Sequence, residues 1–291
     1  DDDFLVKNSL IKSTMKLIDE KQFKILLSSI KIEETVSGGS VANSIVGLSQ
    51  LGNDVGFVGK VSEDSLGQKY EDGLIKEKVE YLYKKKKELI PTGSCLILIT
   101  PDSERTMCTY LGTAGKINDA DIDVSTIKDS EITFLEGYLW DEGEPKKAFD
   151  KAIANSNKVA MSLSDLFCVE RHREHFLELS KNKLDIIFAN EQEILSLINK
   201  KSFIEAVAFS KELNKQVIIT RGEKGAISIN GNKIAEYPAE ANLKIKDLTG
   251  AGDLFAAGYL HGYINNHSME ECLEKGTKLS SKIIQKIGAR I

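Results

Sequence analysis

Short apolar segments alternate with helix-like segments along most of this 291-residue chain, and this alternation limits the fold more than any other feature. Several apolar segments, rich in Ile, Val and Leu, lack a polar side, which is typical of strands covered on both faces. The predicted strands cover residues 56–61, 95–100, 132–137, 159–163, 185–190 and 217–221. The predicted helices cover residues 40–51, 64–78, 145–155, 170–181, 191–199, 202–214, 251–265 and 269–287.

The alternation predicts an α/β fold with three layers, in which helices cover both faces of a mostly parallel sheet. Asn230-Gly231 predicts a hairpin turn within residues 226–237. Residues 4–35 and 79–115 look like strands without intervening helices. We expect them to form a small discontinuous β lid within a single domain of residues 1–291. Ligands of such folds bind beyond the carboxyl ends of the strands, so the functional residues are expected there.

Composition excludes several classes of protein. The net charge of −5, from 39 basic and 44 acidic residues, argues against a nucleic-acid partner, which requires a clustered basic surface. No run of about 18 apolar residues occurs, so we expect no membrane-spanning helix. The four cysteines are far apart and form no CxxC pair, which argues against a zinc knuckle and fits a reducing cytoplasm. We assign the HxxH pair His172 and His175 to an exposed helix face.

The sharpest chemical signal is the segment DLTGAGD at residues 247–253. Gly250 and Gly252 permit close backbone approach, and the helix that follows offers unpaired amides and the positive end of its dipole to an anion. Asp253 in the first turn suits a base for a hydroxyl group that attacks phosphorus, and the alternative is a helix-start carboxylate alone. GxxxxGK[ST] is absent and Phe255 stands where Gly or Ala is needed, so the segment is neither a Walker A loop nor a dinucleotide fingerprint.

This segment, with Ala-Ala-Gly in the helix after it, resembles the second signature of the ribokinase-like (PfkB) small-molecule kinases. The first signature is matched by SGGSVAN at residues 37–43 and continues to Gly67. NEQE at 190–193 and TRGEKG at 220–225 match two further motifs in order and spacing. By these four motifs the chain is identified as a member of the family. It is most similar to bacterial adenosine kinase-type members, at residues 91–95, 105–107, 110–112, 135–140 and 287–290.

The resemblance implies roles for individual residues in phosphoryl transfer. Asp253 would be the general base, and the amides of Gly250, Ala251 and Gly252 would stabilise the transferring phosphoryl group. Arg105 would clamp phosphoryl oxygens through bidentate hydrogen bonds, with an ordinary surface arginine as the alternative.

The same resemblance assigns residues to the acceptor. Gly38, Gly39 and Asn43 would bind substrate hydroxyls, with a polar position on a helix face as the alternative for Asn43. An apolar slot for a purine ring would be lined by Met107, Leu111, Tyr138 and Trp140, unless these residues simply pack in a core. Family members begin with a strand that ends in a Gly-Asn…Asp segment, whose Asp anchors sugar hydroxyls. No residue here matches that Asp, and we expect the printed sequence to lack that start.

The nucleotide and its metal complete the implied site. ATP would be bound by Asn190, Thr220, Gly222 and Gly225, of which the last three would otherwise form a turn into the next strand. Glu193 would hold Mg²⁺ through water, and the alternative is a helix-capping pair with Asn190. Asp247 and Thr249 would help hold a monovalent cation such as K⁺, with a turn-stabilising Asp as the alternative.

Together these residues imply a cytoplasmic enzyme of purine salvage that uses ATP and Mg²⁺ to phosphorylate the 5′-hydroxyl of adenosine. Three other functions stay open. They are a sugar kinase of the ribokinase or fructokinase type, an inosine kinase, and a non-catalytic nucleoside-binding protein on the same scaffold. The sequence is compatible with a monomer or a homodimer.

Overall fold

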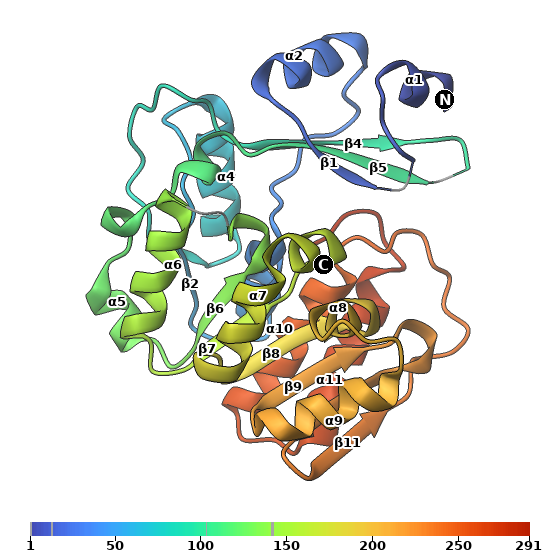
Figure 1. Ribbon diagram of the computed structural model, residues 1–291. Helices are drawn as coiled ribbons and strands as arrows, with labels where there is room; N and C mark the ends of the chain where they lie inside the picture. The colour runs from blue at the N-terminus through green and yellow to red at the C-terminus, as the bar shows by residue number, and fades with distance from the viewer. Residues whose placement is uncertain (1, 13, 103, 141–142) are drawn as a thin grey trace. The chain divides into compact units, whose positions relative to one another are not determined.

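The computed structural model describes all residues except 1, 13, 103, 141 and 142 (Figure 1). The chain divides into two compact units, which we describe one at a time. The small unit consists of Asp1–Ser37, Gly59–Gly73 and Tyr83–Ile117. The large unit consists of Gly38–Val58, Leu74–Leu82 and Asn118–Ile291.

The small unit is built on a three-stranded sheet in the order β1-β5-β4. Its strands are β1 (Met15–Leu17), β4 (Ser94–Ile99) and β5 (Arg105–Tyr110), with β4 antiparallel and β1 parallel to β5. Two helices, α1 (Asp2–Lys7) and α2 (Glu20–Ser29), pack with this sheet around a core that includes Leu5, Leu26, Leu96 and Cys108. Residues from both predicted lid stretches therefore share one sheet.

The prediction that residues 4–35 hold only strands is wrong, because this stretch contains α1 and α2. The side chain of Asp19 caps α2 by accepting a hydrogen bond from the amide of Gln22. Phe23, Leu26 and Ile30 then recur at a helical spacing and pack on the small core. A capping residue followed by that spacing favours a helix over a strand. The rest of this unit includes the short helix η1 (Gly112–Lys116) and the first part of α4 (Ser65–Lys76).

The large unit is built on a six-stranded sheet in the order β11-β10-β9-β8-β7-β6. The four strands β6 to β9 run parallel, and β10 and β11 form an antiparallel hairpin at one edge, as the Asn230-Gly231 turn predicts. The bounds are β6 (Thr133–Glu136), β7 (Val159–Ser162), β8 (Ile186–Asn190), β9 (Gln216–Thr220), β10 (Ala226–Asn230) and β11 (Lys233–Tyr237). The predicted α/β class and mostly parallel sheet are confirmed.

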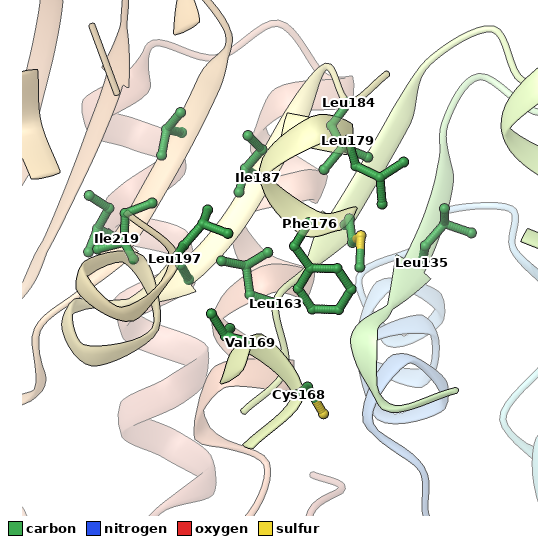
Figure 2. Close-up of a cluster of buried hydrophobic side chains, with 14 of the residues drawn as sticks. Leu135, Leu163, Cys168, Val169, Phe176, Leu179, Leu184, Ile187, Leu197 and Ile219 are labelled. Carbon is green, nitrogen blue, oxygen red and sulfur yellow. The ribbon is translucent and has the colours of Figure 1, made fainter. Parts of the chain in front are cut away.

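Helices cover both faces of this sheet (Figure 1). Ile187 of β8 faces a core cluster packed under α6, α7, α8 and α9, and Figure 2 shows Phe176 of α7 among its side chains. Phe188 points the other way, where its ring contacts Tyr259 of α10. The bounds of these helices are α6 (Glu144–Asn155), α7 (Leu166–Asn182), α8 (Glu191–Leu197), α9 (Phe203–Leu213), α3 (Ser40–Gln50), α10 (Ala251–Ile264) and α11 (Met269–Ile283).

Some predicted boundaries move for local reasons. Helix α7 starts at Leu166, four residues earlier than predicted, because Asp165 caps it by accepting a hydrogen bond from the amide of Phe167. The strand predicted at 56–61 is shorter in the structure, where β2 (Gly56–Phe57) pairs with β3 (Glu80–Tyr81) in a two-stranded sheet. The large unit also contains α5 (Val124–Asp129), η2 (Asp119–Asp121), η3 (Gly137–Leu139) and η4 (Gly222–Lys224). Within the described residues, no helix is long and apolar enough to cross a membrane.

Candidate functional site

The start of α10 carries the candidate base. Gly250 precedes the helix in a left-handed conformation, with φ +79°, and a Cβ there would lie 2.9 Å from atoms of Ala289. A side chain at this position would be strained and would collide with the C-terminal segment, so the turn requires glycine. The turn places Asp253 in the first helical turn, as the sequence predicts.

Both carboxylate oxygens of Asp253 are held by side chains of α3. Ser40 Oγ donates to Oδ1 at 2.7 Å, and Asn43 Nδ2 donates to Oδ2 at 2.9 Å. Burial raises the pKa of Asp253 to about 6, against the hydrogen bonds from Asn43 and Ser40 and the charge of Arg290, which lower it. A carboxylate with this pKa is mostly ionised at neutral pH and can still accept a proton, which suits a general base.

Helix α3 is positioned for these contacts by the glycine pair before it. Gly39 precedes the helix with φ +105°, a backbone conformation that residues with a side chain rarely adopt. Ser40 and Asn43 then stand three residues apart on one helix face, so both reach the same carboxylate. The structure therefore brings together Gly38, Gly39 and Asn43 with Asp253, as the sequence predicts.

The structure adds two charged residues that sequence reasoning missed. Glu136 ends β6, and its Oε2 accepts a hydrogen bond from the amide of Val41 at 3.1 Å. Burial and the negative charge of Asp253 both raise the pKa of Glu136, against that hydrogen bond. A glutamate at the carboxyl end of a predicted parallel strand was the available signal. The second residue, Arg290, donates from Nε to Asn43 Oδ1 at 3.1 Å and from Nη2 to the carbonyl oxygen of Gly38 at 3.3 Å.

Asp247 connects the glycine segment to the end of the chain. Its side chain is 3% exposed and accepts hydrogen bonds from the amide of Thr249 at 2.9 Å and from the amide of Gly288 at 2.8 Å. The turn-stabilising role that the sequence left open is therefore present. It fixes two loops against each other beside the start of α10.

Asn190 and Glu193 form the reciprocal capping pair that the sequence left open. The amide of Glu193 donates to Asn190 Oδ1 at 2.8 Å, while the amide and Nδ2 of Asn190 donate to the Glu193 carboxylate at 2.9 and 2.6 Å. Burial raises the pKa of Glu193 to about 7, although the bonds from Asn190 lower it. A buried carboxylate with a raised pKa would be stabilised by a nearby cation, so its chemistry fits the predicted Mg²⁺ role as well as the cap.

The predicted ATP-binding residues end two neighbouring strands. Asn190 of β8 and Thr220 of β9 are register partners, and Gly222 follows at the start of η4. Gly225 closes this loop with φ +85°, and a Cβ there would lie 2.1 Å from the carbonyl oxygen of Tyr237. Only glycine fits such a position, so the loop geometry depends on it.

The residues predicted to line a purine slot come from both units, Tyr138 and Trp140 from the large one. Tyr138 donates its hydroxyl to the carbonyl oxygen of Ser164 at 3.2 Å, and burial raises its pKa. Trp140 belongs to the large core, where its ring packs against Phe149 and Phe176, so its slot role is wrong and the core alternative holds.

The other predicted acceptor and phosphate contacts belong to the small unit. Arg105 and Met107 lie on β5, and Leu111 helps line a cavity of about 250 Å³ in that unit, with Tyr110 and Gly112 beside it. These roles stay predictions. Among the described residues, no three His, Cys, Asp or Glu side chains are grouped as metal ligands.

Comparison with known proteins decides the family. The model of the pfkB family of carbohydrate kinases matches residues 16–291. The chain belongs to the PfkB family. This PfkB protein is therefore a kinase, a phosphotransferase whose family uses ATP with Mg²⁺ and a small-molecule acceptor, and the four motifs predicted this membership correctly.

The relatives of this PfkB protein carry both nucleoside and sugar kinase names. It is 36% identical to the adenosine kinase from Sinorhizobium meliloti, whose structure it matches over 100% of its own length and 90% of that chain, with a TM-score of 0.94. A probable sugar kinase protein from Rhizobium etli CFN 42 is also 36% identical, over 100% and 89% of the two chains, with a TM-score of 0.92. Adenosine kinase 2 from Arabidopsis thaliana is 24% identical over 99% of this chain and 90% of its own. The ribokinase-like fold is confirmed by these matches.

Proposed function

We propose that this PfkB kinase transfers the γ-phosphoryl group of ATP to the 5′-hydroxyl of adenosine, in the cytoplasm, with Asp253 as the general base. The observation that carries the proposal is the position of Asp253 in the first turn of α10, with both oxygens held by Ser40 and Asn43. The identity of 36% with a bacterial adenosine kinase over the full chain supports adenosine as the acceptor.

Asp253 and the two substrates account for every proton and bond in the proposed reaction. The Asp253 carboxylate accepts the proton of the 5′-hydroxyl as the oxygen attacks the γ-phosphorus. A new O5′–P bond forms, the bond from the γ-phosphorus to the bridging oxygen breaks, and ADP leaves with that oxygen. The amides of Gly250, Ala251 and Gly252 donate to the transferring group, where preorganised donors lower the barrier by ~3–4 kcal/mol each in comparable sites.

On the nucleotide side, Asn190, Thr220, Gly222 and Gly225 contact ATP in this proposal. Mg²⁺ neutralises the charge of the phosphates when it is bound. Glu193 takes part through water, because both of its oxygens are already hydrogen-bonded by Asn190.

Two further groups complete the proposal. Asp247 and Thr249 support a K⁺ ion, for which the test is turnover in K⁺ against the same concentration of choline.

The phosphate and the acceptor are contacted by Arg105, Met107, Leu111 and Tyr138 in this proposal. Residues 4–35 and 79–115 act as a lid. The Arg105→Met variant tests the clamp through a rise in KM for ATP or a fall in kcat.

An acceptor panel tests the proposal directly. ADP release is measured with adenosine, inosine, ribose and fructose as acceptors, and a reaction without acceptor gives the background hydrolysis. The proposal expects the largest kcat/KM for adenosine, with AMP as product. A larger kcat/KM for ribose or fructose than for adenosine would mean that the acceptor is a sugar, as the similarity to the Rhizobium etli protein favours. Calorimetric binding of adenosine without transfer to any acceptor would support the non-catalytic alternative and overturn the proposal.

A further inference from the structure

The last arginine of the chain contacts two of the segments that form the site. Arg290 Nε donates to Asn43 Oδ1 at 3.1 Å, and Arg290 Nη2 donates to the carbonyl oxygen of Gly38 at 3.3 Å. One guanidinium therefore holds both the glycine pair and the side chain that donates to Asp253. The planar fork of arginine suits two such bonds, whereas lysine has a single ammonium group.

We propose that Arg290 is a positioning residue for phosphoryl transfer, which fixes the side-chain amide of Asn43 so that its N–H groups face Asp253 and the acceptor. The inference rests on the proposed role of Asp253 as the base. It concerns a residue that acts through Asn43 and that itself need not touch the substrate.

The amide of Asn43 has one acceptor oxygen and two N–H donors. Arg290 occupies the oxygen, and Asp253 accepts from the nitrogen at 2.9 Å. A flipped amide would set its donors against the guanidinium and its oxygen against the carboxylate. Charge on both sides therefore selects one orientation, and the second N–H can serve a hydroxyl oxygen of the substrate.

The segment that carries Arg290 is itself fixed on both sides. The amide of Gly288 donates to the buried Asp247 at 2.8 Å. Ala289 lies so close to Gly250 that a Cβ on that glycine would meet it at 2.9 Å. The backbone before Arg290 therefore contacts the same loop that positions Asp253. These contacts fix the position from which the Arg290 side chain reaches Asn43 and Gly38.

The charge of Arg290 also bears on the base. Asp253 accepts hydrogen bonds from Ser40 and Asn43 of α3 and interacts through charge with Glu136 of β6, Tyr138 of η3 and Arg290. The charge of Asp253 raises the pKa of Glu136, so the two ionised carboxylates disfavour each other, whereas the charge of Arg290 lowers the pKa of Asp253. Loss of the Arg290 charge would remove an interaction that favours the ionised carboxylate of Asp253, so a higher pH would be needed to ionise the base.

The test uses the full-length kinase with ATP, Mg²⁺ and the best acceptor of the panel above. Three variants are compared with wild type: Arg290→Met removes charge and fork, Arg290→Lys keeps the charge, and Lys278→Met removes an exposed cation of α11 as the control. We expect kcat to fall ~10- to 100-fold in Arg290→Met, as for other small misplacements of catalytic groups, and the acidic limb of its pH profile to move to higher pH. Arg290→Lys should also lose kcat while its acidic limb stays at the wild-type position, and Lys278→Met should match wild type.

A double-mutant comparison shows whether Arg290 acts through Asn43. Because the two side chains are coupled, Arg290→Met should lower kcat much less in an Asn43→Ala background than in wild type. Equal losses in both backgrounds would contradict the inference. So would a wild-type kcat and acidic limb in Arg290→Met, or, if that variant does not fold, a wild-type kcat in Arg290→Lys. Asp253→Asn separates the two proposals: if it keeps full turnover the base assignment fails, and if it is inactive while Arg290→Met is normal, only this inference fails.

Discussion

Replacing Glu193 with Gln should change stability in a way that depends on pH. The Glu193 carboxylate is buried, and burial raises its pKa to about 7 from the ordinary 4.5. Because the folded-state pKa lies above the unfolded one, the contribution of Glu193 to stability is largest below about pH 4.5 and is lost as the pH rises through about 7. A shift of this size corresponds to about 3 kcal/mol of lost stability once both states are ionised.

Gln is neutral at every pH and removes this cost. It also turns one carboxylate oxygen into an NH₂ group, which cannot accept the bond from Asn190 Nδ2 and costs ~1 kcal/mol. Glu193→Gln should therefore be more stable than wild type by ~2 kcal/mol at pH 8.5, and within ~1 kcal/mol of it at pH 5, where folded Glu193 is already protonated.

Urea unfolding at the two pH values measures this difference. Trp140 is the only tryptophan and lies in the core of the large unit, so its fluorescence reports on the unit that contains Glu193. Glu274→Gln, which changes a partly exposed glutamate of α11, is the control and should show no gain at pH 8.5. Equal destabilisation of Glu193→Gln at both pH values would refute the reasoning. In the same variant, a wild-type Mg²⁺ requirement would leave Glu193 as a helix cap alone.

Three further predictions concern the loop, the core and the base. Gly225→Ala should lower stability by about 1–3 kcal/mol and raise KM for ATP, since the residue needs φ +85° beside the Tyr237 carbonyl; an unchanged melting curve would contradict this. Phe176→Ala should cost ~3–5 kcal/mol in urea unfolding because the ring is fully buried in the core, and a cost below ~1 kcal/mol would show that the core repacks. The kcat/KM for the acceptor should fall below about pH 6, where Asp253 becomes protonated, and a flat profile down to pH 5 would argue against this base.

Local patterns in the sequence predicted most of the fold. The strands of the main sheet are continuous apolar runs, and the helices between them have clear starts, so β6 to β9 and their helices were found within a few residues. Helix α2 was missed because the apolar residues just before it, Met15, Leu17 and Ile18, suggested a strand, and its own apolar residues form only a short helical pattern. Trp140 was misplaced for a different reason, because an aromatic side chain after a strand suits a core and a binding slot equally.

The residues of the candidate site also fall into two groups, those that local patterns predict and those that depend on distant partners. Asp253, Gly250 and the pair of Asn190 with Glu193 lie within short motifs, whose spacing alone places them at helix starts. Glu136 and Arg290 act through partners 95 and 247 positions away, and no local pattern encodes such contacts. Their positions follow from the parallel sheet, which brings the end of β6 and the start of α3 together, and from the folding of the C-terminal segment back onto Gly250.

The turnover of Asp253→Asn tests the central claim most directly. The amide keeps the size of the side chain but cannot accept the hydroxyl proton, so kcat should fall by about 10²- to 10⁴-fold while ATP still binds in calorimetry. Asp150→Asn, an exposed carboxylate of α6 paired with Lys146, is the matched control and should be fully active. Turnover of Asp253→Asn near that of wild type would contradict the account.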